Sequence, residues 1–279
     1  MPGRSPSERS GIRKGKSGIS AARPLDHPQG RSGSSKSALT VVATGVSGGY
    51  DHPVRLVCFG DIHMAFQAIA RLGPTLREAD LAILTGDLTN FGDPPDACRV
   101  VDAVRQFCPR ILAVTGNLDM PWVIDALAAA GISLHGEARR FGDLGIFGCG
   151  GSNVTPMDTP TELEEHELSA VLERAHAGVA DAPRRLLICH TPPFDTRLDR
   201  LRNGTPVGSP AVRAFIEAVR PDLAVVGHIH EGRGIDRVGD TTVVNPGALR
   251  DGGYAVVEYD EANGALRAEL RRLETRLVL

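Results

Sequence analysis

Short apolar runs alternate with amphipathic segments through the first half of the chain. The apolar runs lie at 54–61, 79–87 and 110–117. They are hydrophobic almost without interruption until their last residues, which is the pattern of strands buried on both faces. The segments that follow them space their apolar residues as helices do, and they lie at 66–72, 96–107 and 122–131. Strands that alternate with helices predict a parallel sheet of the α/β class.

The second half of the chain predicts a hairpin, two helices and several further strands. Two short runs at 139–151 surround Gly142–Asp143 and indicate the hairpin. Thr161 and Glu164 have the spacing of a capping box, which predicts a helix from there to about Ala177. Ser209 before a proline predicts the start of the other helix. Further strands are expected at 184–190, 222–228, 232–238, 241–245, 253–259 and 265–273.

Several of the apolar runs end in a polar residue that can bind a metal ion. These residues are Asp61, His63, Asp87, Asn117, His190, His228 and His230. Each one alone is readily explained as a turn residue or a buried histidine. Ligands of open α/β sheets bind beyond the carboxyl ends of the strands, however, and here five strand ends carry such residues. We therefore expect the seven side chains to meet at one edge of the sheet.

The first fifty residues differ in composition from the rest of the chain. Residues 1–50 are rich in Ser, Gly and Arg and carry a formal charge of +6, against −3 for all 279 residues, which leaves −9 for 51–279. Such a segment has too little apolar surface to fold, so we expect a disordered basic tail followed by a single domain at 51–279. The tail lacks the apolar core of a signal peptide, and the five cysteines are scattered without a CxxC pair. Both features favour a cytoplasmic protein.

The domain contains no lysine, because Lys14, Lys16 and Lys36 all lie in the tail. This excludes a P-loop nucleotide site and a Schiff-base nucleophile from residues 51–279. The acidic balance of the domain also disfavours tight binding to nucleic acid. No apolar run is long enough to span a membrane.

The order of the strand-end motifs resembles a known family. The blocks GD-x-H, GD, GN, H and GH-x-H resemble the calcineurin-like metallophosphoesterase superfamily over about residues 54–259. The stretches beginning GCGGSNVTPMD, HTPPFDTRLD and GHIHEGRGID resemble its branch of bacterial and archaeal phosphoesterases related to the Icc cyclic-AMP phosphodiesterase. The resemblance implies a four-layer α/β/β/α sandwich, in which helices flank two mixed sheets.

The resemblance also implies two metal ions at one end of the sandwich. Carried over residue by residue, it places Asp61, His63 and His230 on one ion. It places Asn117, His190 and His228 on the other, with Asp87 as the bridge. Oxygen and imidazole donors suit manganese, our first expectation, as well as iron or zinc. Two such ions can hold a hydroxide nucleophile and clamp both ends of a displacement at phosphorus.

These features predict a dinuclear metal-dependent phosphoesterase, and more specifically a phosphodiesterase acting on a small phosphate ester. Two alternatives are an interaction module that uses the same fold without catalysis and a nuclease of the same superfamily. Neither the physiological substrate nor the oligomeric state is indicated. One departure from the superfamily pattern is Leu118, where many members carry a histidine that is thought to protonate the leaving group.

Other polar residues are weaker candidates for the site. Asn153, Thr155 and Arg250 could contact substrate, and Asn245 could orient a metal ligand. Asp195, Arg197 and Arg200 follow His190 and could form salt bridges or meet a substrate.

Overall fold

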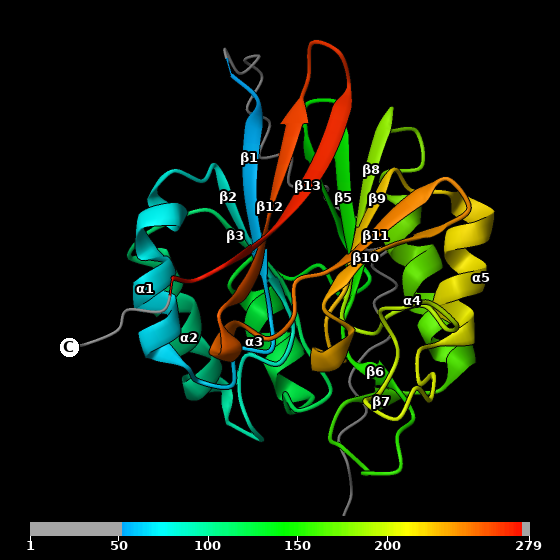
Figure 1. The fold of residues 1–279 in the computed structure, drawn as a ribbon. Coiled ribbons are helices and arrows are strands. Elements are labelled where there is room, and N and C mark those ends of the chain that lie inside the picture. The colour runs from blue at the N-terminus through cyan, green and yellow to red at the C-terminus, as the bar shows by residue number, and fades with distance from the viewer. Residues whose placement is uncertain (1–51, 275–279) are drawn as a thin grey trace, which may run out of the picture. The chain divides into compact units, whose positions relative to one another are not determined.

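The computed structural model describes residues 52–274 and arranges them in four layers (Figure 1). Two mixed β-sheets lie face to face, and helices cover the outer face of each. The expected α/β/β/α sandwich is therefore confirmed. The tail predicted for residues 1–50 lies outside the described residues.

The first sheet has five strands, and the three that carry predicted ligands are parallel neighbours. In spatial order the strands are β13 (Ala265–Arg272), β12 (Gly253–Asp260), β1 (Val54–Phe59), β2 (Leu81–Thr85) and β3 (Ile111–Val114). The antiparallel pairing of β12 with β1 makes the sheet mixed. Because β1, β2 and β3 run in the same direction, their carboxyl ends lie at the same edge.

The second sheet has six strands with a parallel centre. In spatial order they are β10 (Gly234–Val238), β11 (Thr241–Asn245), β9 (Leu223–Val225), β8 (Arg184–Cys189), β5 (Leu144–Cys149) and β4 (Ala138–Phe141). Strands β4 and β5 form the predicted hairpin. A separate short pair, β6 (Ser152–Asn153) and β7 (Glu162–Leu163), follows β5.

Three helices pack on the first sheet and two on the second. They are α1 (Phe66–Arg77), α2 (Pro94–Arg105), α3 (Trp122–Ala129), α4 (Glu165–Ala177) and α5 (Pro210–Val219). The predicted cap of α5 is confirmed, since the Ser209 hydroxyl accepts a hydrogen bond from the Val212 amide. None of the helices in the described residues is long and apolar enough to cross a membrane.

The predicted start of α4 is wrong. The helix begins at Glu165, and its capping box joins Glu164 to Glu167 rather than Thr161 to Glu164. The Thr161 hydroxyl instead donates to the carbonyl of Asp119, far away in sequence. The residues directly after it form β7 instead of a helical turn.

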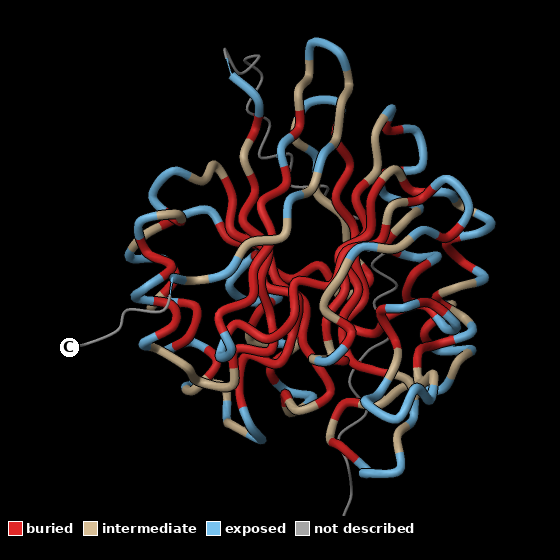
Figure 2. Tube along the Cα trace, in the orientation of Figure 1, coloured by how far each residue is buried: buried red, intermediate tan, exposed pale blue. Residues whose placement is uncertain are grey.

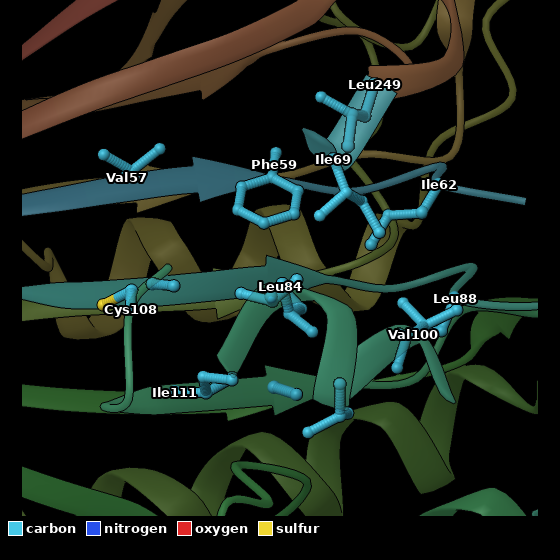
Figure 3. Packing of buried hydrophobic residues seen from close by; sticks show 14 of the residues in the cluster. Val57, Phe59, Ile62, Ile69, Leu84, Leu88, Val100, Cys108, Ile111 and Leu249 are labelled. Atoms are coloured by element: carbon cyan, nitrogen blue, oxygen red, sulfur yellow. The ribbon is translucent and has the colours of Figure 1, made fainter. Parts of the chain in front are cut away.

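Apolar side chains fill the three spaces between the four layers. One cluster lies between the sheets, and the other two lie between each sheet and its helices. Figure 3 shows part of the cluster under α1 and α2, where Phe59 and Leu84 of the first sheet lie near Ile69 and Val100. The central strands and the loops directly after β1, β2, β3, β8 and β9 are mostly buried, whereas the edge strand β13 is more exposed (Figure 2). The rigid core thus holds the polar strand ends in place.

Candidate metal centre

Asp61, His63 and His230 bring one group of donor atoms together. Asp61 and His63 follow β1, and His230 opens the short 3-10 helix η1 (His230–Gly232) beyond β9. One donor atom from each lies within 4.8 Å of the others. Nε2 of His230 is 3.2 Å from Oδ1 of Asp61 and 3.5 Å from Nε2 of His63. Within residues 52–274, the buried Oδ1 of Asp61 has this contact with His230 but no well-aligned hydrogen bond. A buried carboxylate oxygen is costly without a partner, and a cation between these donors would satisfy it.

The imidazole of His63 is oriented so that a lone pair faces this group. Its Nδ1 donates to Oδ1 of Asn90 at 2.7 Å, and burial lowers the pKa of the ring. The neutral ring therefore carries its proton on Nδ1 and leaves Nε2 free as a donor to metal. Asn90 was not predicted from the sequence as part of the site.

A second group joins Asp61 to Asp87 and His190, again with donor atoms within 4.8 Å of one another. Nδ1 of the fully buried His190 donates to the carbonyl of Thr85 at 2.8 Å, and burial lowers its pKa. The free Nε2 of His190 lies 3.2 Å from Oδ1 of Asn117. This carbonyl–histidine arrangement is the one that fixes metal-binding imidazoles in other proteins.

His228 lies beside the second group. Its ring centroid is 5.2 Å from that of His190. Burial, followed by the neighbouring His190, lowers the pKa of His228 to about 3. The ring is therefore neutral at physiological pH, which is the protonation state that binds metal.

Asp87, a member of the second group, also faces the first. Its Oδ1 is 3.7 Å from Nε2 of His190, and its Oδ2 is 4.0 Å from Nε2 of His63. Each carboxylate oxygen thus faces a histidine of a different group. Burial, then Asp61, then Asp119 raise the pKa of Asp87 well above its usual range. Divalent cations would remove this conflict between neighbouring buried carboxylates.

Four of the seven predicted ligands have a left-handed backbone. The φ angles are 48° at Asp61, 50° at His63, 48° at Asp87 and 67° at His228. Such angles cost non-glycine residues about 1–3 kcal/mol each, so they persist only where the surroundings impose them. Each of these residues lies just after a strand, and the sharp turn aims its side chain across the sheet edge. The strain is therefore concentrated at the site itself.

Asp119 organises the loops that carry these ligands. Its buried carboxylate accepts hydrogen bonds from the amides of Gly116, Leu88 and Thr89 and from the Thr89 hydroxyl. It therefore ties the loop after β2 to the loop after β3. No side chain larger than hydrogen fits at Gly116, because a Cβ there would lie 2.0 Å from Oδ1 of Asp87. In the sequence, Asp119 stands two residues after the predicted ligand Asn117.

Asn245 has the orienting position predicted for it. From the end of β11 its buried Nδ2 donates to the carbonyls of Gly227 (3.4 Å) and Ile229 (2.8 Å), on either side of His228. It therefore holds the strained turn that separates His228 from His230.

Asn245→Ala is expected to weaken metal binding by about 10–100-fold, the usual effect of removing a partner that orients ligands. The side chain does not face the metal groups directly, so the number of ions bound at saturation stays the same. Calorimetric metal titration measures both quantities. Asn263→Ala, at an exposed turn, is the control and leaves the affinity unchanged. An unaltered affinity in Asn245→Ala would contradict the orienting role.

Glu162 is connected to Asn117 by hydrogen bonds through the hydroxyl of Thr159. Nδ2 of Asn117 donates to the hydroxyl of Thr159 at 2.9 Å, which turns Oδ1 of Asn117 toward His190. The Glu162 carboxylate accepts hydrogen bonds from the amides and hydroxyls of both Thr155 and Thr159. Although its burial acts in the opposite direction, these bonds lower the pKa of Glu162 to about 2.

Glu162→Gln is expected to destabilise the metal-free protein, and the effect depends on pH. A carboxyl with a depressed folded-state pKa contributes stability above its ordinary value of 4.5 and loses that contribution as the pH falls toward 2. Melting temperatures of wild type and variant should therefore differ at pH 7 and converge below pH 4. A constant difference across this range would contradict the role of the charge.

The weaker candidates divide into structural residues and one neighbour of the site. Asp195 pairs with Arg200 at 2.6 Å and Arg197 lies 3.7 Å from Asp236, so these charges form salt bridges. The Thr155 hydroxyl donates to the Glu162 carboxylate, and Nδ2 of Asn153 donates to the carbonyl of Val207. Arg250, in the 3-10 helix η2 (Leu249–Asp251), instead places Nη2 3.2 Å from Nδ1 of His230.

The fold and the Asp/His groups at the strand ends are those expected of a metal-dependent hydrolase. A family model described as calcineurin-like phosphoesterase matches residues 54–232, and the chain belongs to this family. It is accordingly a hydrolase acting on phosphoester bonds.

Known proteins resemble the chain over most of its length. An uncharacterized protein of Methanocaldococcus jannaschii is 31% identical over 223 residues, which cover 76% of this chain and 98% of that protein. The crystal structure of TT1561 of Thermus thermophilus has a TM-score of 0.61 at 18% identity and covers 80% of this chain and 100% of its own. A dimetal phosphatase from Danio rerio has a TM-score of 0.54 at 14% identity, with 80% and 97% covered. The two structures share the fold.

Proposed function

We propose that the chain is a dinuclear metal-dependent phosphodiesterase, related to the Icc branch, that acts on a small phosphate ester. The observation that carries this proposal is the position of Asp87, whose two oxygens face histidines of two different donor groups. Asp61, His63 and His230 are proposed to hold one ion, and Asn117, His190 and His228 the other. The similarity in fold to a protein described as a dimetal phosphatase supports two ions rather than one.

The donor set fits divalent ions of intermediate softness, with manganese as our proposal and iron or zinc as alternatives. When bound, two such ions supply the positive charge that activates a water nucleophile and stabilises the phosphoryl oxygens. The protein contributes orientation. The carbonyl of Thr85, Oδ1 of Asn90 and the hydroxyl of Thr159 fix the donor atoms of His190, His63 and Asn117 before any ion arrives. Such preorganisation avoids rearrangement during the reaction.

A comparison of substrates with several metals tests the proposal. The full chain is stripped with a chelator and reloaded separately with Mn²⁺, Fe²⁺ or Zn²⁺, and bound metal is measured by elemental analysis. Hydrolysis is then followed for cyclic nucleotides, bis(p-nitrophenyl) phosphate and p-nitrophenyl phosphate. We expect two ions per chain and faster hydrolysis of the diesters than of the monoester. Faster monoester hydrolysis would contradict the phosphodiesterase assignment, and absence of bound metal would contradict the dinuclear site.

A further inference from the structure

Most of the exposed large apolar side chains lie on segments that follow strands at the sheet edges carrying the candidate ligands. Seven such side chains occur among residues 52–274: Phe91, Trp122, Val154, Met157, Phe194, Leu201 and Ile235. The first six belong to the loops or helix start that follow β2, β3, β5 with β6, and β8. Only Ile235 lies elsewhere in this part of the chain, on β10. Clustered exposed apolar groups of this kind mark binding surfaces, whereas scattered ones have no such meaning.

Phe91 is tied directly to the candidate ligands. Its amide donates to the carbonyl of Leu118 at 2.9 Å, and the amide of Leu118 donates to Oδ1 of Asp87 at 2.8 Å. The preceding residue, Asn90, accepts the hydrogen bond from His63. Phe91 therefore has a fixed position at the metal centre even though its side chain is 60% exposed.

The backbone of Phe91 is strained as well. Its φ is 58°, an angle that is a genuine outlier for a bulky side chain. The Phe91 ring is exposed, and the strain in its backbone is therefore not offset by burial of the side chain. A strained, exposed aromatic residue beside a reactive site indicates a role in binding.

Val154 and Met157 belong to the loop between β6 and β7, which is joined to the same site. This loop includes Thr159, which accepts the hydrogen bond from Asn117. Met157 is 79% exposed, and a thioether side chain adapts readily to an apolar partner. Trp122 is 46% exposed at the start of α3, in the segment that follows Asn117. We call Phe91, Trp122, Val154 and Met157 the apolar rim.

Arg250, on a different element, adds a positive charge beside the candidate ligands. Arg250 of η2 contacts His230, and within the described residues it has no carboxylate partner. The guanidinium of Arg250 is exposed to solvent, so it is accessible to an anion held at the neighbouring donor groups. A phosphate group would supply that anion, since guanidinium and phosphate pair well.

We propose that the substrate is an amphiphilic phosphoester. Its phosphate lies between the metal centre and Arg250, and a bulky apolar group on one of its ester oxygens packs on the apolar rim. This inference rests on the proposed function, because it requires the phosphate to bind at the metal groups. It adds the chemical class of the group attached to the phosphate.

Two phosphonates that the enzyme cannot hydrolyse as esters provide the test. Methylphosphonate and hexylphosphonate carry the same headgroup, and both are titrated calorimetrically into the manganese-loaded full chain. Five additional methylenes packed on the rim should tighten binding about tenfold or more. Trp122 is the only tryptophan of the chain, so its fluorescence should shift to the blue with hexylphosphonate alone.

Variants of the rim separate packing from headgroup binding. Phe91→Asn is suitable because asparagine tolerates the left-handed backbone, and it is combined with Met157→Ser. This double variant should lose most of the preference for hexylphosphonate while keeping its affinity for methylphosphonate. Ile235→Ser, the matched change outside the rim, should keep the preference.

Two results would overturn the inference, and they differ in what they mean for the proposed function. Equal affinity of the wild type for both phosphonates, or a preference that survives in the rim variant, would refute the apolar rim and leave the phosphoesterase site intact. Failure of the loaded protein to bind either phosphonate would refute the phosphate site and the rim together.

Discussion

Asp87→Asn is expected to lower phosphoester hydrolysis by about a thousandfold or more and to reduce metal occupancy at both positions. The reason is that each oxygen of Asp87 faces a different donor group, so one substitution affects both ions. Metal ions typically contribute several kcal/mol to transition-state stabilisation in such enzymes. About 1.4 kcal/mol corresponds to tenfold in rate, which gives the expected magnitude.

The same substitution should raise the stability of the metal-free protein. The pKa of Asp87 is raised by burial, then by Asp61 and Asp119, so the folded state binds a proton that the unfolded chain has already released. The free energy of unfolding therefore falls as the pH rises from the ordinary value of 3.8 toward the raised pKa. Asparagine cannot ionise and is free of this penalty.

Melting temperature and metal content, measured together, test both halves of this prediction. With chelator present at pH 7, Asp87→Asn should melt above the wild type, and with excess manganese it should melt below it. Asp102→Asn, an exposed carboxylate on α2, should match the wild type under both conditions. Retention of two ions by Asp87→Asn would show that Asp87 does not bridge them.

Leu118→His is expected to accelerate the hydrolysis of esters with poor leaving groups. Leu118 is half-buried beside Asp87, where its amide donates to the carboxylate, and its side chain has no proton to give. General acid catalysis is usually worth about a hundredfold to ten-thousandfold. In the wild type, aryl phosphodiesters should therefore react readily and alkyl diesters slowly. The new histidine should help the alkyl esters most.

The slope of log rate against leaving-group pKa measures this effect. The slope should be steep in the wild type and shallower in Leu118→His, and the gain should disappear as the pH rises above the histidine pKa because the acid form is lost. Leu118→Gln controls for polarity alone, since its amide does not ionise. A shallow wild-type slope that the histidine leaves unchanged, with chemistry rate-limiting, would mean that another group supplies the proton.

Much of this structure could be predicted because the relevant signals are local. The runs before Asp61 and Asp87 show a buried strand followed by a polar turn, and parallel strands bring such turns to one edge. The cap at Ser209 is likewise a contact between near neighbours in sequence, and it was predicted correctly.

The contacts that were not predicted join residues far apart in sequence. The carboxylate of Asp119 accepts from amides of a loop some thirty residues earlier, and Glu162 acts on Asn117 only through Thr159. Thr161 illustrates the same limitation, since its hydroxyl donates to the distant carbonyl of Asp119. Hydrophobic periodicity carries no information about which loops meet, so the network that orients the ligands became visible only in the folded chain.

The donor groups draw on both sheets, with Asp61, His63, Asp87 and Asn117 following the first and His190, His228 and His230 following the second. Ions bound there would link the two sheets at one end. They would join residues that are far apart in sequence, such as His63 and His230, which are 167 residues apart. A ligand that binds only the folded state adds stability that grows with the logarithm of its free concentration, about 2.7 kcal/mol at a hundred times the Kd. The free energy of unfolding would therefore rise with the metal concentration.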